Sequence, residues 1–328
     1  MRYDKISIVV PTYNDCDFLP RCLESLLNQK GAVHNRDYEI IVIDDGSTDG
    51  TPETASRYPV KYLRLDRNMG KVTARKTGAE NAAHDTLLFV DSRIIAGDDL
   101  LESFRRTGKS PLIAGEVMSG GRDSANPDTR LFYLLRRIYY YPYFPFERGK
   151  ELTYITKNNF NRIPKGMGCC FMTKRLFFSS MPETFGKHTN DDTAIFSNIV
   201  YKNNTEIVKC RGIKVTYMHR KGSGDLAAWI TRRGITFYDY YMHGHLLFRI
   251  LVPVSAVLAV FLFASLFFRP LYFLAASGLL AACYLISAIV LSEKMSDFPL
   301  VFARFYRYAF LFYFGTLKGW FLKCRCCT

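Results

Sequence analysis

The amino-acid sequence predicts an α/β domain followed by a C-terminal transmembrane helical hairpin. Up to about residue 240, short apolar runs that end in polar turns alternate with segments of helical periodicity. From residue 246 the chain becomes apolar and carries two long uncharged runs in succession. We therefore expect three parts: an α/β domain at 1–240, the hairpin at 246–292, and a further helix with a tail at 298–328.

Four apolar runs have the length and the flanking turns of buried strands, and they cover residues 6–10, 39–43, 60–65 and 86–90. Apolar residues at helical spacing between 18 and 27 predict a helix after the first strand, and a second helix is expected after Gly70. This alternation implies parallel strands, whose ligands bind beyond the carboxyl ends. Polar residues stand there in the sequence: Thr12, Asn14, Asp44, Asp45 and Asp91.

The composition limits the partners and the compartment. A formal net charge of +14 favours an anionic partner. Because no basic run has the spacing of a nucleic-acid motif, we expect a membrane surface or a phosphorylated substrate and no nucleic acid. The nine cysteines are irregularly spaced and follow a polar N-terminus without signal-peptide features. A reduced domain that faces the cytosol fits this pattern best.

Two uncharged apolar runs, 250–268 and 271–291, each approach the roughly 20 residues that a membrane-crossing helix needs. Only Arg269 and Pro270 separate them. This arrangement predicts a transmembrane hairpin, and a buried pair of core helices is the alternative.

Two further segments combine apolar and basic residues. In 300–322 the charges Arg304, Arg307 and Lys318 fall within one narrow helical stripe. This stripe suggests a helix that lies in the membrane interface, with a third crossing helix as the alternative. Segment 131–144 mixes tyrosines with arginines, which suits either a membrane interface or an ordinary helix packed on the domain.

Four motifs stand at the predicted strand ends in a set order. They are Val-Val-Pro-Thr-Tyr-Asn at 9–14, Val-Ile-Asp-Asp-Gly-Ser-Thr-Asp at 42–49, Asn-Met-Gly-Lys at 68–71 and Phe-Val-Asp-Ser-Arg at 89–93. The first two together are highly specific, and the set resembles the family 2 glycosyltransferases over roughly residues 5–240. The resemblance implies the GT-A fold, a Rossmann-like mixed sheet with flanking helices, and a nucleotide-sugar donor.

The resemblance also implies which residues bind the donor. Pro11, Thr12 and Tyr13 would line a slot for the base, and Asp44 would accept a hydrogen bond from it. For Asp45, a turn with a helix cap is the alternative. The full set is Pro11, Thr12, Tyr13, Asn14, Asp44, Asp45, Lys71, Asp91, Arg93, Gly166 and Gly168, where the two glycines belong to a Lys-Gly-Met-Gly loop. Lys71 and Arg75 stand where cations can face the diphosphate, and ordinary solvated helix charges are the alternative.

The stretch His-Thr-Asn-Asp-Asp-Thr at 188–193 resembles the acidic pair of the family, which makes Asp192 the expected general base. It would take the proton of the acceptor hydroxyl during direct displacement at the anomeric carbon, with inversion of configuration. An N-cap of the helix that begins near residue 193 is the alternative, because Asn and Asp are good caps. Asp191, Arg232 and Arg233 are expected near the acceptor or its phosphate.

At the metal site the sequence departs from the family pattern. The fourth strand normally ends in Asp-x-Asp, and its second carboxylate contacts the divalent cation, but here the triplet is Asp91-Ser92-Arg93. His219 resembles the C-terminal histidine ligand of the family. We expect Asp91 and His219 to hold Mg²⁺ or Mn²⁺ with diphosphate and water while Arg93 turns aside. The alternative is that Arg93 binds the diphosphate without metal.

The sequence thus predicts an inverting glycosyltransferase that moves a sugar from a UDP- or GDP-sugar to a polyprenyl phosphate or lipid-linked glycan. It would be a multi-pass protein of the cell membrane, with the catalytic domain facing the cytosol. A processive polysaccharide synthase is one alternative, weakened because residues 229–233 do not match Gln-x-x-Arg-Trp and because two or three helices are too few for a channel. A non-catalytic nucleotide-sugar-binding protein of the membrane is another, opposed by Asp192 and His219.

Overall fold

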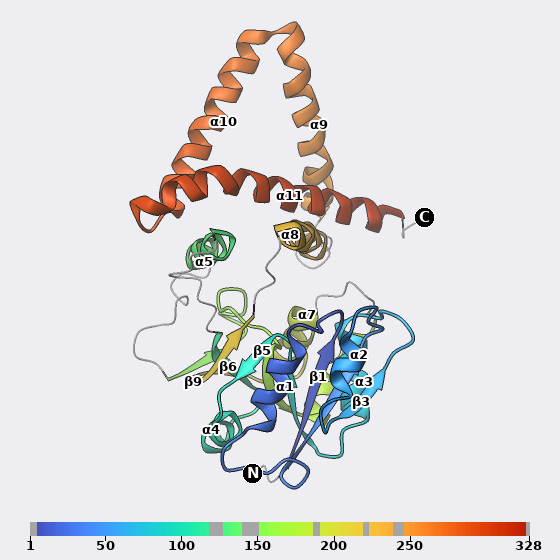
Figure 1. The fold of residues 1–328 in the computed structure, drawn as a ribbon. Coiled ribbons are helices and arrows are strands. Elements are labelled where there is room, and N and C mark those ends of the chain that lie inside the picture. Colours follow the sequence, from blue (N-terminus) through green and yellow to red (C-terminus); the bar gives the residue numbers. More distant parts are fainter. Residues whose placement is uncertain are drawn as a thin grey trace. The chain divides into compact units, whose positions relative to one another are not determined.

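The computed structural model describes residues 5–117, 127–139, 151–185, 191–218, 223–238 and 246–325. The chain forms two compact units, which are drawn in Figure 1. The first comprises Met1–Ser119 and Tyr140–His219, and the second comprises Gly120–Tyr139 and Arg220–Thr328. A short segment from the middle of the sequence therefore belongs to the same unit as the C-terminal part.

One mixed sheet forms the centre of the first unit, with the strand order β3-β2-β1-β4-β8-β6-β9-β5 and β7 paired to β9. The four predicted strands are confirmed as β1 (Ile6–Thr12), β2 (Tyr38–Asp44), β3 (Lys61–Arg64) and β4 (Thr86–Val90), which run parallel. The remaining strands are β5 (Ile94–Ala96), β6 (Leu112–Val117), β7 (Leu152–Ile155), β8 (Cys169–Thr173) and β9 (Ile207–Tyr217). Because β8 is antiparallel to β4, the sheet is parallel in its first half and mixed in its second.

Helices cover both faces of this sheet. One face packs against α1 (Leu19–Leu27) and α4 (Leu100–Thr107), and the other packs against α3 (Lys71–Glu80), α6 (Lys174–Ser179) and α7 (Asp191–Ser197). Successive strand residues alternate between the two cores: Ile8 and Val10 lie in one, Val9 in the other. The short α2 (Thr51–Ala55) and a π-helical turn at Asn198–Lys202 complete the unit. The helices expected after the first strand and after Gly70 are confirmed.

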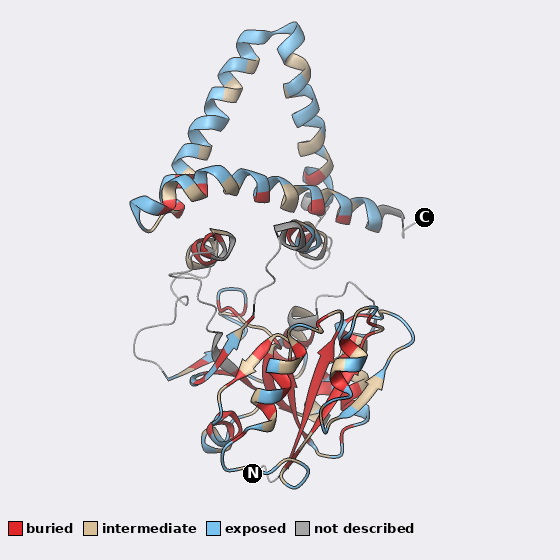
Figure 2. Cartoon of the chain, in the orientation of Figure 1, coloured by how far each residue is buried: buried red, intermediate tan, exposed pale blue. Residues whose placement is uncertain are grey.

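The second unit contains the predicted pair of long apolar helices, α9 (Leu246–Phe268) and α10 (Pro270–Leu291). Their apolar windows have mean hydropathies of 2.6 and 2.2 and are only 6% and 11% buried. Figure 2 shows this exposure along both helices. Core helices would be mostly buried, so the exposure disfavours the alternative of a buried pair, and both helices are long and apolar enough to cross a membrane.

Helix α11 (Phe298–Arg325), which follows the 3₁₀ turn Met295–Asp297, runs across the open end of the hairpin in Figure 1. The Tyr313 hydroxyl lies 2.7 Å from the Ser255 hydroxyl on α9. The Trp320 indole nitrogen donates to the Arg249 carbonyl oxygen at 3.0 Å. These contacts hold α11 at the base of the hairpin.

The two remaining helices pack in the same unit. Helix α8 (Ser223–Phe237) approaches α11 so closely that a Cβ atom added at Gly315 would lie 2.0 Å from the Thr231 carbonyl oxygen. Helix α5 (Pro127–Tyr139) carries Arg130, whose guanidinium donates to Asp297 Oδ2 at 2.6 Å and to Glu293 Oε2 at 3.1 Å. An arginine on the mid-sequence segment therefore pairs with carboxylates that follow α10.

Candidate functional site

Asp44 stands at the carboxyl end of β2 and is fully buried. Its Oδ1 atom accepts a hydrogen bond from the Ser47 amide at 2.8 Å, and its Oδ2 atom accepts one from the Tyr62 hydroxyl at 2.7 Å. The carboxylate thus orders the turn after β2 and joins it to β3. Because a carboxylate has about four acceptor positions, capacity for a ligand hydrogen bond is left.

The next residue, Asp45, links the end of β2 to the start of α3. Its two carboxylate oxygens accept from the amides of Met69 and Gly70 at 2.6 and 2.8 Å. Between these segments, Gly46 has a φ of +73°, and a Cβ atom there would lie 2.7 Å from the Arg67 Cα atom. Only glycine suits this close approach, which brings the Asn-Met-Gly-Lys motif beside the Asp-Asp-Gly motif.

The residues expected to line the base slot stand at the end of β1. Pro11 and Thr12 are buried, and Tyr13 is exposed. The Thr12 hydroxyl oxygen is buried and has no hydrogen-bond partner among the described residues. Such a group is normally satisfied by water or a ligand. Asn14, at a φ of +50°, accepts from the Thr48 amide at 2.8 Å, so that the loops after β1 and β2 are tied together.

Asp91, at the end of β4, meets two cations from α3. Its Oδ2 atom lies 2.9 Å from Lys71 Nζ, and its Oδ1 atom lies 2.9 Å from an Nη atom of Arg75. The Arg75 side chain is fully buried, whereas that of Lys71 is 56% exposed. Burial opposes ionisation of Asp91, but Lys71 and Arg75 outweigh it and lower the pKa of this carboxyl group to about 2. Asp91 is therefore an ionised, immobilised carboxylate.

The expected glycine-rich loop lies against this carboxylate. The Asp91 amide donates to the Gly168 carbonyl oxygen at 2.9 Å, and a Cβ atom added at Gly168 would lie 3.6 Å from Asp91 Oδ2. Gly166 lies two residues earlier and is half-buried. The structure thus brings the third, fourth and glycine-rich motifs to one place.

Arg93 binds Asp15, a residue that lies outside the sequence motifs. Its Nε and Nη2 atoms donate to Asp15 Oδ1 at 2.9 and 2.7 Å. Desolvation disfavours the charge of Arg93, but Asp15 and Tyr217 outweigh this effect and raise its pKa. Asp15 is not among the residues expected from the sequence, whereas Arg75, expected together with Lys71 to face the diphosphate, is buried against Asp91. The four-residue spacing of Arg75 from Lys71, on one face of α3, is the signal that points to it.

For the five remaining predicted residues, the structure does not test the expected positions in the site. Asp191 and Asp192 are the first two residues of α7, and their side chains lie outside the described part of the structure, as does His219. Arg232 and Arg233 are exposed on α8, in the second unit. The roles of these five residues stay predictions.

The donor chemistry of Asp91 suits a divalent cation, since Mg²⁺ and Mn²⁺ bind ionised carboxylate oxygens. Among the described residues, no three His, Cys, Asp or Glu side chains come together as a metal-binding group. Asp91 also pairs with Lys71 through Oδ2, so a cation at this atom requires Lys71 to move aside. The residues present therefore fit a cation held by one protein carboxylate and completed by other ligands.

A family model described as glycosyl transferase family 2 matches residues 7–181 of the 328-residue chain. The chain belongs to glycosyl transferase family 2. Among relatives, the validoxylamine A glucosyltransferase of Streptomyces hygroscopicus subsp. jinggangensis is 32% identical over 164 residues, which cover 45% of this chain and 38% of that protein. The dolichol-phosphate mannosyltransferase of Pyrococcus furiosus is 30% identical over 126 residues, covering 36% of this chain and 35% of that protein. This family 2 chain thus matches well under half the length of these relatives.

One solved structure supports the fold of this family 2 chain. A mannosyltransferase from Pyrobaculum calidifontis, in complex with GDP-Man and Mn²⁺, aligns with a TM-score of 0.57 and 16% identity, covering 96% of this chain and 86% of that one. At this identity the likeness concerns the fold. The expected GT-A fold, with its mixed sheet and flanking helices, is confirmed.

Proposed function

We propose that this chain is an inverting glycosyltransferase that moves a sugar from a UDP- or GDP-sugar to a lipid-linked acceptor at the cytosolic face of a membrane. The observation that carries the proposal is the assembly of the family motifs around Asp91, with Lys71 and Arg75 bound to it. Cations beside an immobilised carboxylate at the ends of parallel strands suit a diphosphate ligand.

The donor would bind along the ends of β1, β2 and β4. The unpartnered Thr12 hydroxyl and the remaining acceptor capacity of Asp44 suit the polar edge of a base and its ribose. Lys71 is half-exposed and can turn from Asp91 to the diphosphate, whereas Arg75 is buried and keeps Asp91 in place. Lys71 would thus bind the diphosphate, and Arg75 would position the Asp91 carboxylate.

Transfer needs a base for the acceptor hydroxyl, and we assign this role to Asp192 at the start of α7. A Mg²⁺ or Mn²⁺ ion, held by Asp91 and His219, would supply Lewis-acid stabilisation of the diphosphate leaving group. Arg75 fixes the orientation of the Asp91 carboxylate through Oδ1, and Lys71 supplies a mobile positive charge for the phosphate oxygens.

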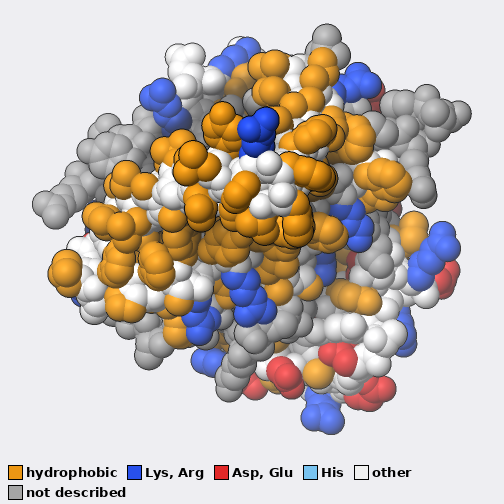
Figure 3. All heavy atoms as spheres, turned by 90° about the horizontal axis from the view of Figure 1, so that it is seen from above, with side chains coloured by type: hydrophobic (Ala, Val, Ile, Leu, Met, Phe, Trp, Pro, Cys, Tyr) orange, Lys and Arg blue, Asp and Glu red, His pale blue; other side chains and the backbone are white. Residues whose placement is uncertain are grey.

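The second unit supports a membrane location. Phe302, Tyr306, Phe310 and Phe314 recur every four residues on one exposed face of α11, opposite the face that packs near α8. Figure 3, which looks onto the hairpin end, shows hydrophobic side chains gathered over this part, with Lys and Arg among them. We infer that α9 and α10 cross the membrane while α11 lies in its interface. The Pyrococcus furiosus relative, named for dolichol phosphate, supports a polyprenyl phosphate acceptor.

Replacement of the proposed base tests this function. Asp192→Asn should leave nucleotide-sugar binding unchanged and lower transfer by roughly two to four orders of magnitude, because no base then takes the proton from the hydroxyl group of the acceptor. Radiolabelled sugar transfer to polyprenyl phosphate, together with calorimetric donor binding, would measure both effects. Wild-type turnover in Asp192→Asn would refute the assignment. A wild-type protein that binds donor but transfers nothing to any lipid acceptor would favour the non-catalytic alternative.

A further inference from the structure

A single carboxylate binds both residues that follow Asp91. Asp15 Oδ2 accepts a hydrogen bond from the Ser92 hydroxyl at 2.5 Å, and Asp15 Oδ1 accepts two from the Arg93 guanidinium. The side chains of Asp15 and Arg93 are only 8% and 16% exposed. A charge-assisted pair at this depth is screened far less than a surface pair.

Asp15 is itself held in place by the backbone around it. Its amide donates to the Thr51 hydroxyl at 3.1 Å, and its carbonyl oxygen accepts from the amides of Phe18 and Leu19 at 3.0 and 2.9 Å. Asp15 therefore belongs to the rigid connection between β1 and α1. This connection includes Tyr13 and directly follows Thr12, the last residue of β1, and both residues belong to the proposed base slot.

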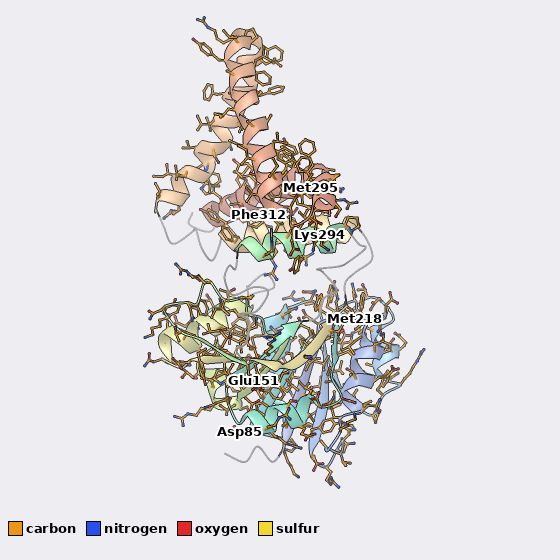
Figure 4. All side chains as sticks on the ribbon, turned by 90° about the vertical axis from the view of Figure 1, so that its left-hand side faces the viewer. Asp85, Glu151, Met218, Lys294, Met295 and Phe312 are labelled. Carbon is orange, nitrogen blue, oxygen red and sulfur yellow. The ribbon has the colours of Figure 1, made fainter. Side chains whose placement is uncertain are left out.

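Arg93 makes contacts with two further segments. Its guanidinium lies 5.0 Å from the centre of the Phe18 ring. Its carbonyl oxygen accepts from the Met218 amide at 2.8 Å, at the end of β9, where Figure 4 labels Met218. Arg93 thus joins the loop after β1, the end of β4 and the end of β9.

The charges at positions 15 and 93 are complementary. An acidic residue at 93, as in the family pattern, would face the buried Asp15 carboxylate, and two carboxylates this close repel each other strongly. A cation at 93 removes that repulsion and forms the observed pair. The departure from Asp-x-Asp is therefore matched by a second residue, 78 positions away in the sequence.

We propose that Asp15 and Arg93 are a positioning pair that fixes the donor-binding loop after β1 against the strand end that carries Asp91. On this proposal Arg93, whose guanidinium is bound to Asp15, acts on the donor through the loop and is not a ligand of the diphosphate or of a metal ion. The proposal rests on the proposed function, since its measured effect is on nucleotide binding.

The test uses the full chain in detergent and three variants: Arg93→Ala, Asp15→Ala and the double variant. Asp15→Asn keeps the size of the side chain and removes its charge, so it tests the ion pair even if Asp15→Ala fails to fold. Lys30 and Asp98 form a matched control pair in the same unit, 2.7 Å apart but 71% and 56% exposed. Calorimetry would give the Kd of UDP and GDP. A Mn²⁺ titration would give the concentration that half-saturates activity, and thermal scans would give the unfolding temperature.

Each single variant should weaken nucleotide binding about tenfold, as expected for one buried charge-assisted interaction. The double variant should be no weaker than either single variant, because both remove the same interaction. The Mn²⁺ half-saturation and the Lys30→Ala and Asp98→Ala controls should stay at wild-type values.

Four outcomes would contradict the proposal. A much larger loss of nucleotide binding in Arg93→Ala than in Asp15→Ala would place Arg93 on the diphosphate. Lower unfolding temperatures with unchanged nucleotide Kd would leave the pair a purely structural role. If the wild-type chain bound neither UDP nor GDP, the proposed function itself would fail and the donor role of the pair with it. If the wild-type chain bound UDP or GDP and the variants bound it equally well, the positioning pair would be refuted while the proposed function would stand.

Discussion

At the scale of single residues, the strand-end carboxylates of this glycosyl transferase family 2 chain support the fold and also belong to the candidate site. Asp45 holds the start of α3 through two amides, and Asp91 is held by Lys71 and Arg75. A carboxylate that is already oriented by internal bonds loses little freedom when a ligand binds. The structural role of these residues, such as the turn at Asp45, is therefore compatible with a role in binding the donor.

Metal dependence is a prediction at this scale. EDTA should abolish transfer and Mn²⁺ should restore it, because one carboxylate with the diphosphate leaves a weak site that empties readily. Arg93→Asp alone would set a second carboxylate against Asp15. The tighter half-saturation by Mn²⁺ that an Asp-x-Asp triplet should give is therefore expected most clearly in Arg93→Asp combined with Asp15→Asn. Initial rates over a Mn²⁺ titration would measure this, and full activity in EDTA would contradict it.

At the scale of secondary-structure elements, glycines determine how α8 and α11 pack. A Cβ atom at Gly234 would lie 2.1 Å from the Phe312 carbonyl oxygen, and one at Gly319 would lie 3.0 Å from the Ile235 carbonyl oxygen. Gly315 and Gly319 are four residues apart, so both lie on the same face of α11. Small residues at this spacing let two helix backbones approach each other.

Gly315→Ala should therefore push α8 and α11 apart and destabilise the second unit by about 1–3 kcal/mol, the usual cost of overpacking. Gly278→Ala on α10 is the matched control, since nothing lies within 4 Å of its added Cβ atom. That variant should be neutral or gain up to about 1 kcal/mol from helix propensity. Thermal unfolding in detergent, followed by circular dichroism, would compare them. Equal unfolding temperatures for the two variants would contradict the close packing.

The attachment of α5 is also an element-scale feature, and it depends on pH. The hydrogen bond from Arg130 lowers the pKa of Asp297 to about 2, below its ordinary value near 4. A lowered folded-state pKa stabilises the fold above about pH 4, and this contribution is lost as the pH falls toward 2.

Arg130→Ala should cost about 3 kcal/mol at neutral pH, because it removes the buried cation that pairs with both Asp297 and Glu293. The difference from wild type should shrink between pH 4 and pH 2, where Asp297 becomes protonated in both proteins. Unfolding temperatures of the full chain in detergent across this range would show it. A difference that stays constant with pH would rule out the Asp297 contribution.

At the scale of the whole molecule, the chain passes between its two units three times. Gly120–Tyr139 belongs to the second unit, Tyr140–His219 belongs to the first, and the chain from Arg220 onward belongs to the second. Helix α5 is therefore tied by covalent connections to the first unit on both sides and by Arg130 to residues after α10. Truncation before α9 would remove the partners of Arg130 and expose a cation that is buried in the full chain.

Membrane topology is the prediction for the whole molecule. Lys and Arg residues flank the hairpin on its open side, at Arg249 and Lys294, and only Arg269 lies between the helices. The excess marks the cytosolic side, so the turn at residue 270 should face outward. Pro270→Cys should react with an impermeant maleimide on intact cells, whereas Lys30→Cys in the first unit should react only after permeabilisation. Protection of residue 270 with labelling of residue 30 would reverse the orientation.

The sequence by itself determined the strands of the first half-sheet, the motif order that shows the family, and the two long apolar helices. Each of these depends on local periodicity, turn residues or the length of an apolar run, which neighbouring residues specify. Only the tertiary structure decided that Arg93 pairs with Asp15, that Arg75 is buried against Asp91, and that α5 joins the C-terminal helices. These pairings link positions up to 167 residues apart. They arise because chain topology selects which of many charged side chains meet. Local spacing indicates at most a candidate residue, as it does for Arg75 beside Lys71, and it specifies neither the partner nor the burial.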